Sequence, residues 1–110
     1  MIGPTKVRKL RKEVGLSQES FARALEVSSR EVARWETGLN EPAEPAYTEL
    51  LKFRAMVNNL KKVEYDPARW FQMKSRALSG RSPKEVIVMG STGLEIVFNL
   101  CGRMVHGITT

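Results

Sequence analysis

The chain has 110 residues, enough for one compact domain or a small domain with an appendage, and its hydrophobic content of 42% can form a modest core. A net charge of +6 and an isoelectric point near 9.8 make nucleic acid the first partner to consider. One cysteine, Cys101, excludes an internal disulfide or a multi-cysteine metal site, and one histidine, His106, leaves little for a zinc site or a serine–histidine pair.

The first 62 residues predict four helices. Helix 5–14 ends at Gly15, and Ser17 can cap a second helix over residues 18–26. The segment 28-SSRE-31 has the pattern of a capping box and opens a third helix that stops at Gly38. After a loop rich in Pro, Asn and Gly, Pro45 suits the first turn of a fourth helix over 46–62. The apolar side chains expected to face inward are Val7, Leu10, Val14, Phe21, Ala22, Leu25, Val32, Trp35, Leu50, Leu51, Met56, Val57 and Leu60.

The last 48 residues predict three more helices. Asp66 and Pro67 can start one that runs to about Leu78, and the run 79-SGRSPKE-85 interrupts it and starts a helix over 83–89 with a second capping box. A third capping box, 92-TGLE-95, opens a final helix that Gly107 stops. Helix 83–89 is short and apolar, with Val86, Ile87, Val88 and Met89, and Trp70 is expected to anchor the core. The inward residues expected on the final helix are Leu94, Val97, Phe98, Cys101 and Met104 or Val105. No segment alternates with a period of two, so we predict an all-α protein.

Two short helices joined by a tight turn, the second with exposed Ser and Arg near its start, describe a helix-turn-helix. Its second helix lies in the DNA major groove, and on residues 28–37 the outward face carries Ser29, Arg30, Ala33, Arg34 and Thr37. Arginine can donate two hydrogen bonds to guanine, which gives about 1–3 kcal/mol of base discrimination. Exposed arginines also serve solubility alone, and the segment 6-KVRKLRK-12 is as well explained by a solvated face as by phosphate contacts.

The segment 16-LSQESFARALEVSSREVARWETG-38, followed by Pro42, resembles the Cro- and lambda-repressor-like (Xre) family, and the likeness extends over residues 7–60. It implies a lambda-repressor-like helix-turn-helix bundle over residues 1–62. It also implies that Gln18 contacts a phosphate and braces the recognition helix, that Ser29, Arg30 and Arg34 read bases, and that Asn40 contacts the phosphate backbone.

The same resemblance explains two acidic residues. Glu36 and Arg11 match a pair that in some members forms an inward salt bridge between the first and third helices. Glu41 stands where relatives often carry lysine or arginine, which should weaken phosphate contacts at that loop.

Residues 63–110 form a second expected unit, a small helical domain. The stretch 70-WFQMKSRALSGRSPKEVIVMGSTGLEIVFNLCGRMVHG-107 resembles the C-terminal toxin-binding domain of Xre-type antitoxins, the partners of RES-domain toxins. The match departs at 73-MKS-75, which replaces a proline–asparagine turn. The resemblance implies an NAD-consuming toxin whose active-site entrance this chain covers. The residues expected at that contact are Trp70, Arg81, Arg103, His106 and Gly107. For Arg103 the alternative is charge placement at a helix end, and for His106 a plain surface histidine.

Two functions are consistent with the sequence. The first is a dimeric type II antitoxin that binds operator DNA, neutralises its toxin and represses its own operon. The second is a prophage- or plasmid-type repressor whose rear half only dimerises. An enzyme is poorly supported, because no Gly-rich phosphate loop follows a strand and the carboxylates are scattered, so we expect no catalytic residue, cofactor or metal. A purely structural adaptor would be indifferent to alanine at Arg30 and Arg34.

The beginning of the sequence, MIGPTKVRKL, lacks the apolar segment of a secretory signal. No apolar run approaches the ~18–20 residues that cross a bilayer. We therefore expect a soluble, cytoplasmic protein with no membrane segment.

Overall fold

The computed structural model describes residues 2–106, except for the side chain of His106. Across this range the chain is helical and forms no β-strand, which confirms the all-α class. The elements are α1 (Pro4–Glu13), α2 (Gln18–Leu25), α3 (Ser29–Thr37), α4 (Ala46–Lys62), α5 (Pro67–Gln72), the 3-10 turn η1 (Arg76–Leu78), α6 (Pro83–Ile87) and α7 (Ser91–His106). None of the helices between residues 2 and 106 is long and apolar enough to cross a membrane.

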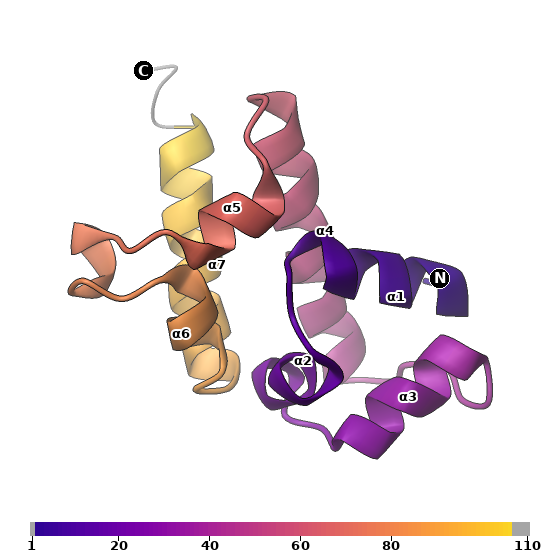
Figure 1. Ribbon diagram of the computed structural model, residues 1–110. Helices are drawn as coiled ribbons and strands as arrows, with labels where there is room; N and C mark the ends of the chain where they lie inside the picture. The colour runs from indigo at the N-terminus through magenta and orange to yellow at the C-terminus, as the bar shows by residue number, and fades with distance from the viewer. Residues whose placement is uncertain (1, 107–110) are drawn as a thin grey trace.

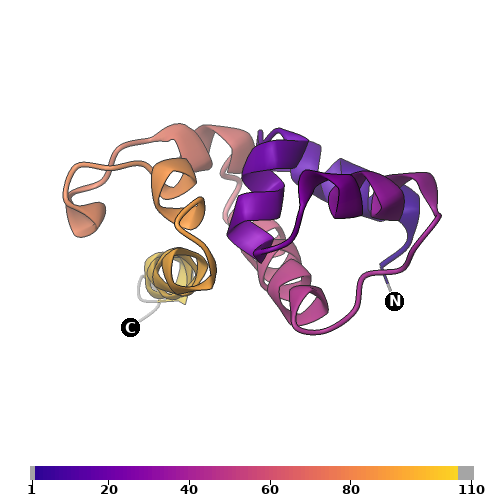
Figure 2. The ribbon, with the colours of Figure 1, turned by 90° about the horizontal axis from the view of Figure 1, so that it is seen from below.

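The long helix α4 runs through the middle of the molecule between two groups of helices (Figure 1), which also contact each other directly through α2 with α7 and α1 with α5. Helices α1, α2 and α3 gather on one side of it, and α5, α6 and α7 lie on the other (Figures 1 and 2). The two groups share a core. Phe53 of α4 packs between Phe21 of α2 and Phe71 of α5, with ring centroids 5.1 Å and 6.3 Å apart. Phe53 was not among the expected inward residues, although it lies three positions after Leu50 on the same face.

Two helix ends in the first half follow the expected local rules, and a third does so only in part. Ser17 accepts a hydrogen bond from the Ser20 amide, and Gly38 ends α3 in the left-handed region at φ 82°. Ser28 caps α3 through the Glu31 amide, but the Glu31 side chain does not reach back. The capping box expected at residues 28–31 is therefore only half formed, because the Glu31 carboxylate accepts from Asn40 instead.

In the second half, α5 is shorter than expected. It ends at Gln72 rather than near Leu78, because Met73 is extended (ψ 130°) and Ser75 pairs through its backbone with Arg81. Ser75 then caps the short turn η1 with its side chain, and such local bonds compete with helix continuation.

The end of α6 and the start of α7 also differ from the expected positions. Helix α6 begins with the expected capping box of Ser82 and Glu85 but ends at Ile87, so Met89, the last residue of the expected helix, lies beyond it and is 61% exposed. Helix α7 begins at Ser91, so the predicted box 92-TGLE-95 lies inside the helix. The amide of Ser91 is capped from α2, by the side chain of Glu26.

The contact between α6 and α7 depends on a glycine. A Cβ added to Gly93 would lie 2.0 Å from the carbonyl oxygen of Val86, which is fixed backbone. Gly102, further along the same helix, has no atom within 4 Å of the corresponding position. The two glycines therefore separate the effect of close packing from the effect of helix propensity.

We predict that Gly93→Ala lowers the free energy of unfolding by about 2–3 kcal/mol, because α6 and α7 must move apart to admit the methyl group. Gly102→Ala, the matched control, should be neutral or stabilise by about 0.5–1 kcal/mol, because alanine is the better helix former. Urea unfolding followed by circular dichroism measures both. Equal effects of the two substitutions would contradict the packing account.

Candidate nucleic-acid interface

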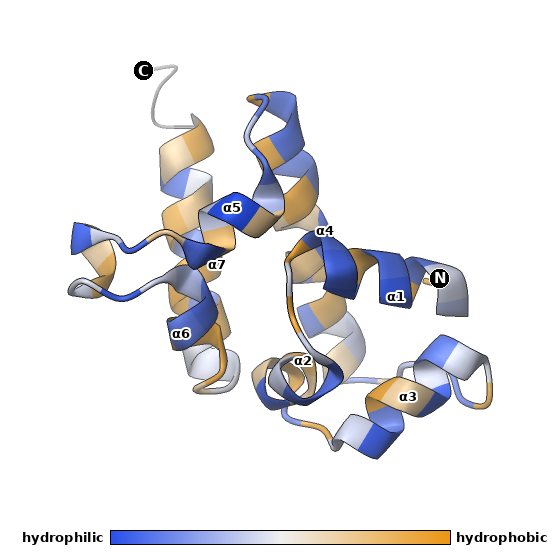
Figure 3. Cartoon of the chain, viewed as in Figure 1, coloured by the Kyte–Doolittle hydropathy of each residue, from blue (hydrophilic) through white to orange (hydrophobic). Residues whose placement is uncertain are grey.

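Helix α3 is amphipathic, with a polar outer face and an apolar inner one (Figure 3). The outer residues Ser29, Arg30, Arg34 and Thr37 are all exposed, and Ala33 between them is half-buried. Within residues 2–105, neither Arg30 nor Arg34 forms an ion pair with a carboxylate. Arg30 and Arg34 are four residues apart, so they lie one helical turn from each other on the same face. Without carboxylate partners in that range, both guanidinium groups are available to an anionic partner.

The inner face of α3 is held by packing. Val32 and Trp35 are 0% and 2% exposed, as the spacing predicts. Glu36 is also buried, although it is charged. Its carboxylate needs compensation there, because an unpaired buried charge is very costly.

That compensation comes from the two helices next to α3. Arg11 of α1 donates to Glu36 from Nε at 2.6 Å and from Nη2 at 3.0 Å. Gln18, the first residue of α2, donates to the same carboxylate at 3.1 Å, and Arg8 lies 3.5 Å from it. A fork of two hydrogen bonds from one guanidinium is both strong and directional. One carboxylate therefore joins α1, α2 and α3.

The protonation of Glu36 is shifted by this environment. Burial alone raises the pKa of the carboxyl, but the hydrogen bonds from Arg11 and Gln18 and the charge of Arg11 outweigh it, so the pKa lies below its usual value. A lowered pKa in the folded state means that the stabilisation is fully present above the unfolded pKa of about 4.3 and is lost as the pH falls through the folded pKa.

We predict that Arg11→Met lowers the free energy of unfolding by about 3 kcal/mol at pH 7, because it leaves the Glu36 charge largely uncompensated. The loss should shrink at acidic pH, because without Arg11 burial favours the neutral form of Glu36, and the variant takes up a proton there that removes the uncompensated charge. Urea titrations at pH 7 and pH 3 measure it. The double variant Arg11→Met/Glu36→Gln should recover most of the stability at pH 7, and a double variant no more stable than Arg11→Met would contradict the account.

The other residues assigned to DNA contact are placed as follows. Gln18 is half-buried and donates a hydrogen bond to Glu36 of α3. This contact corresponds to the expected bracing of α3, whereas the expected phosphate contact stays a prediction. The hydroxyl of Thr37 donates to the carbonyl oxygens of Ala33 and Arg34, so it is committed to its own helix. Asn40 is exposed and its amide donates to Glu31 at 3.3 Å.

The basic segment of α1 divides between two surfaces. Arg8 faces Glu36, whereas Lys6 and Lys9 line a hollow between α1 and α4. Arg54 and Lys61 of α4 line the same hollow, and Lys61 pairs with Glu13. These lysines lie beside α4 and not beside α3, a division that the one-dimensional pattern of residues 6–12 did not indicate.

The residues assigned to toxin contact lie apart from α3. Trp70 is only 6% exposed and its indole N–H donates to the sulfur of Met104 at 3.2 Å, so it is a core anchor with little surface to offer. Arg81 and Arg103 are exposed. The side chain of His106 and all of Gly107 lie outside the described residues.

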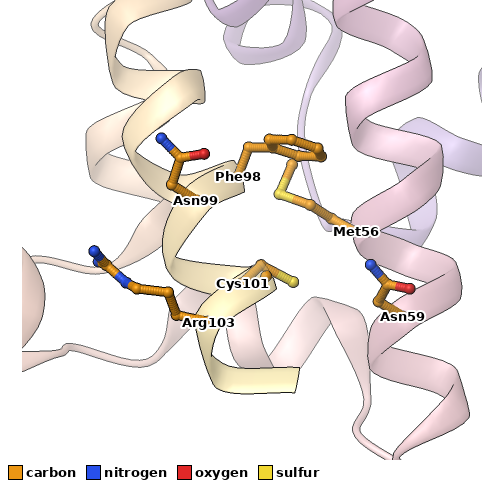
Figure 4. Close-up of a pocket in the computed structure, with 7 residues that line it drawn as sticks. Met56, Asn59, Phe98, Asn99, Cys101 and Arg103 are labelled. Atoms are coloured by element: carbon orange, nitrogen blue, oxygen red, sulfur yellow. The ribbon is translucent and has the colours of Figure 1, made fainter. Parts of the chain in front are cut away.

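A groove of about 520 Å³ separates part of α7 from α4 (Figure 4). Met56, Phe98 and Cys101 point into it, whereas Arg103 extends away from α4 (Figure 4). Burial raises the pKa of the Cys101 thiol to about 11, so the thiol stays protonated at neutral pH and is a poor nucleophile. The surface of the groove is mainly apolar, and its protonated thiol is not suited to nucleophilic chemistry.

Comparisons with known proteins agree with this architecture. Residues 7–53 match a family model described as helix-turn-helix, which covers α2 and α3 and their packing partners in the first half of the chain. A chain of the crystal structure of the M. tuberculosis MbcT–MbcA toxin–antitoxin complex has a similar fold, with a TM-score of 0.63 and 22% sequence identity. The alignment covers 96% of this chain and 95% of that one. No curated protein matches the sequence.

The class that these observations define is an all-α protein with an N-terminal helix-turn-helix, in which α3 is the second helix of the motif. The likeness to the M. tuberculosis chain extends this agreement in fold beyond the motif to nearly the whole molecule.

Proposed function

We propose that this chain is a sequence-specific DNA-binding antitoxin. Helix α3 enters the major groove with Arg30 and Arg34 directed at base edges, and the rear half binds a toxin. The observation that carries the DNA-binding part is the division of α3: its outer face holds two guanidinium groups without carboxylate partners in residues 2–105, while Glu36 on its inner face is locked to α1 and α2. A recognition helix needs this combination of free donors and fixed orientation.

The antitoxin part has two supports. The fold similarity to a chain of a toxin–antitoxin complex extends over nearly the whole of both chains, so it includes the rear half and not only the helix-turn-helix. Residues 70–107 also resemble the toxin-binding domain of antitoxins that partner RES-domain toxins. We therefore propose a RES-type, NAD-consuming toxin as the partner and repression of the shared operon by a homodimer of this chain. The chain itself is not an enzyme in this proposal.

The rear residues best placed to meet the toxin are Arg81 and Arg103, because both are exposed and charged. Trp70 is almost wholly buried, so it offers little surface to a partner. In the alternative function, a repressor whose rear half only dimerises, the same surface would face a second copy of the chain.

We predict that Arg30→Ala and Arg34→Ala each reduce discrimination between the operator and a scrambled duplex by about 1–3 kcal/mol while leaving the thermal stability unchanged. Arg54→Ala is the matched control, because it removes the same charge from an exposed position in the hollow between α1 and α4. Fluorescence anisotropy on both duplexes, at several salt concentrations, measures the difference. If Arg54→Ala lowers discrimination as much as the α3 variants do, α3 does not read bases.

We predict that co-expression with the adjacent reading frame, if it encodes a RES-type protein, yields a stable complex and rescues growth. Charge reversal at Arg81 and Arg103 should weaken copurification, whereas Arg30→Ala should leave it intact, because the two faces are separate. Size-exclusion chromatography and a growth assay provide the readout. A rear half that only dimerises would give neither copurification nor rescue.

A further inference from the structure

The side chain of Glu26 forms a hydrogen bond between the end of α2 and the start of α7, which are far apart in the sequence but packed together. Glu26 is the C-cap residue of α2 and has a φ of 57°, in the left-handed region where glycine is the ordinary choice. Its carboxylate accepts a hydrogen bond from the backbone N–H of Ser91, at 2.6 Å. A glutamate at such a backbone position is unfavourable locally, and the hydrogen bond of its side chain to Ser91 offsets part of that cost.

The start of α7 is built to receive this carboxylate. The first turn of α7 contains no acidic residue of its own, so Glu26 supplies the negative charge that a helix N-terminus favours. Gly90, just before the helix, has a φ of 104°, and a Cβ there would lie 2.6 Å from the Glu26 carboxylate oxygen. Gly90 therefore leaves the space that the carboxylate occupies. The hydrogen bonds from the amide and hydroxyl of Ser91 hold the pKa of Glu26 below its usual value, which keeps the cap charged at neutral pH.

The same residue lies next to the recognition helix. Ser28, two positions after Glu26, caps α3 by accepting from the Glu31 amide. Val27, between them, donates from its amide to the carbonyl of Ala22 and so closes the end of α2. The turn at residues 26–28, which sets the direction in which α3 begins, is thus held by the end of α2 and, through Glu26, by the first turn of α7.

We propose that Glu26 is a positioning residue that couples the first turn of α7 to the N-terminus of α3, so that events at α7 change the affinity of α3 for DNA. The DNA part of this inference rests on the proposed function. A partner that moves the start of α7 releases Glu26 and loosens the turn before α3. The rear half then regulates DNA binding without touching the DNA.

A second contact between α7 and the rest of the fold provides a control. Lys52 of α4 forms an ion pair with Glu95 of α7 at 2.5 Å and with Glu49 at 3.3 Å. This contact also ties α7 to the first half, but it ends on α4 and not on the turn before α3. Glu95→Gln therefore removes a comparable exposed carboxylate from the neighbourhood of α7 without affecting Glu26.

The experiment compares Glu26→Gly with Glu95→Gln in the full chain. Glycine suits the left-handed backbone at residue 26, so the variant keeps the end of α2 and removes only the carboxylate. In Glu26→Gly we expect hydrogen exchange to become about fivefold to tenfold faster at the amides of Ser91, Glu31 and Val32, on the scale of losing one helix cap. Affinity for a duplex taken from upstream of the chain's own reading frame should fall about fivefold. Glu95→Gln should match the wild type in both measurements.

The two measurements separate the coupling from the proposed function. If the wild type binds no duplex with sequence preference, the DNA-binding proposal fails, and the exchange data still decide whether Glu26 links α7 to α3. If Glu26→Gly speeds exchange at Ser91 while Glu31, Val32 and the duplex affinity stay at wild-type values, Glu26 is only a local cap of α7 and the inference is overturned. Equal effects of Glu95→Gln on α3 would overturn it as well.

Discussion

The hydrogen-bonded carboxylate of Glu36 is the interaction on which the orientation of α3 depends. Helix α3 is short, and a short amphipathic helix has no stable orientation of its own. Val32 and Trp35 hold it against the core, but apolar packing is nondirectional. The fork from Arg11, together with the amide of Gln18, adds direction and joins all three helices at one point. Because the opposite face is fixed in this way, the exposed Arg30 and Arg34 have a defined orientation.

The second constraint is the shared core around α4. Phe53 packs against Phe21 on one side and Phe71 on the other, so the aromatic contacts are continuous across the middle of the molecule. The rear helices are consequently packed against the helix-turn-helix and are not merely appended to it. This arrangement makes coupling between the two ends physically reasonable, because packed cores respond to displacement as units.

Features that depend on neighbouring residues could be predicted from the sequence, and features that depend on distant ones could not. The caps at Ser17 and Ser82 and the stop at Gly38 follow from short patterns, and so do the inward faces of the first three helices. The early end of α5 was missed because it depends on pairing between Ser75 and Arg81 across a turn. The cap of α7 was misplaced because its acceptor, Glu26, lies 65 residues earlier in the chain. The Arg11–Glu36 pair was found only through the family resemblance, since helical spacing within one segment says nothing about partners in another.

The position of Cys101 determines when the chain can be oxidised. Its thiol is walled in by α4 and α7 and holds its proton firmly, so mild oxidants find no thiolate to attack while the two helices stay together. Separation of the helices would expose the sulfur, and an external oxidant could then accept two electrons from two such thiols and join two chains by a disulfide. Crosslinking through Cys101 would therefore select copies whose α4 and α7 have separated, and a thiol reductant would reverse it.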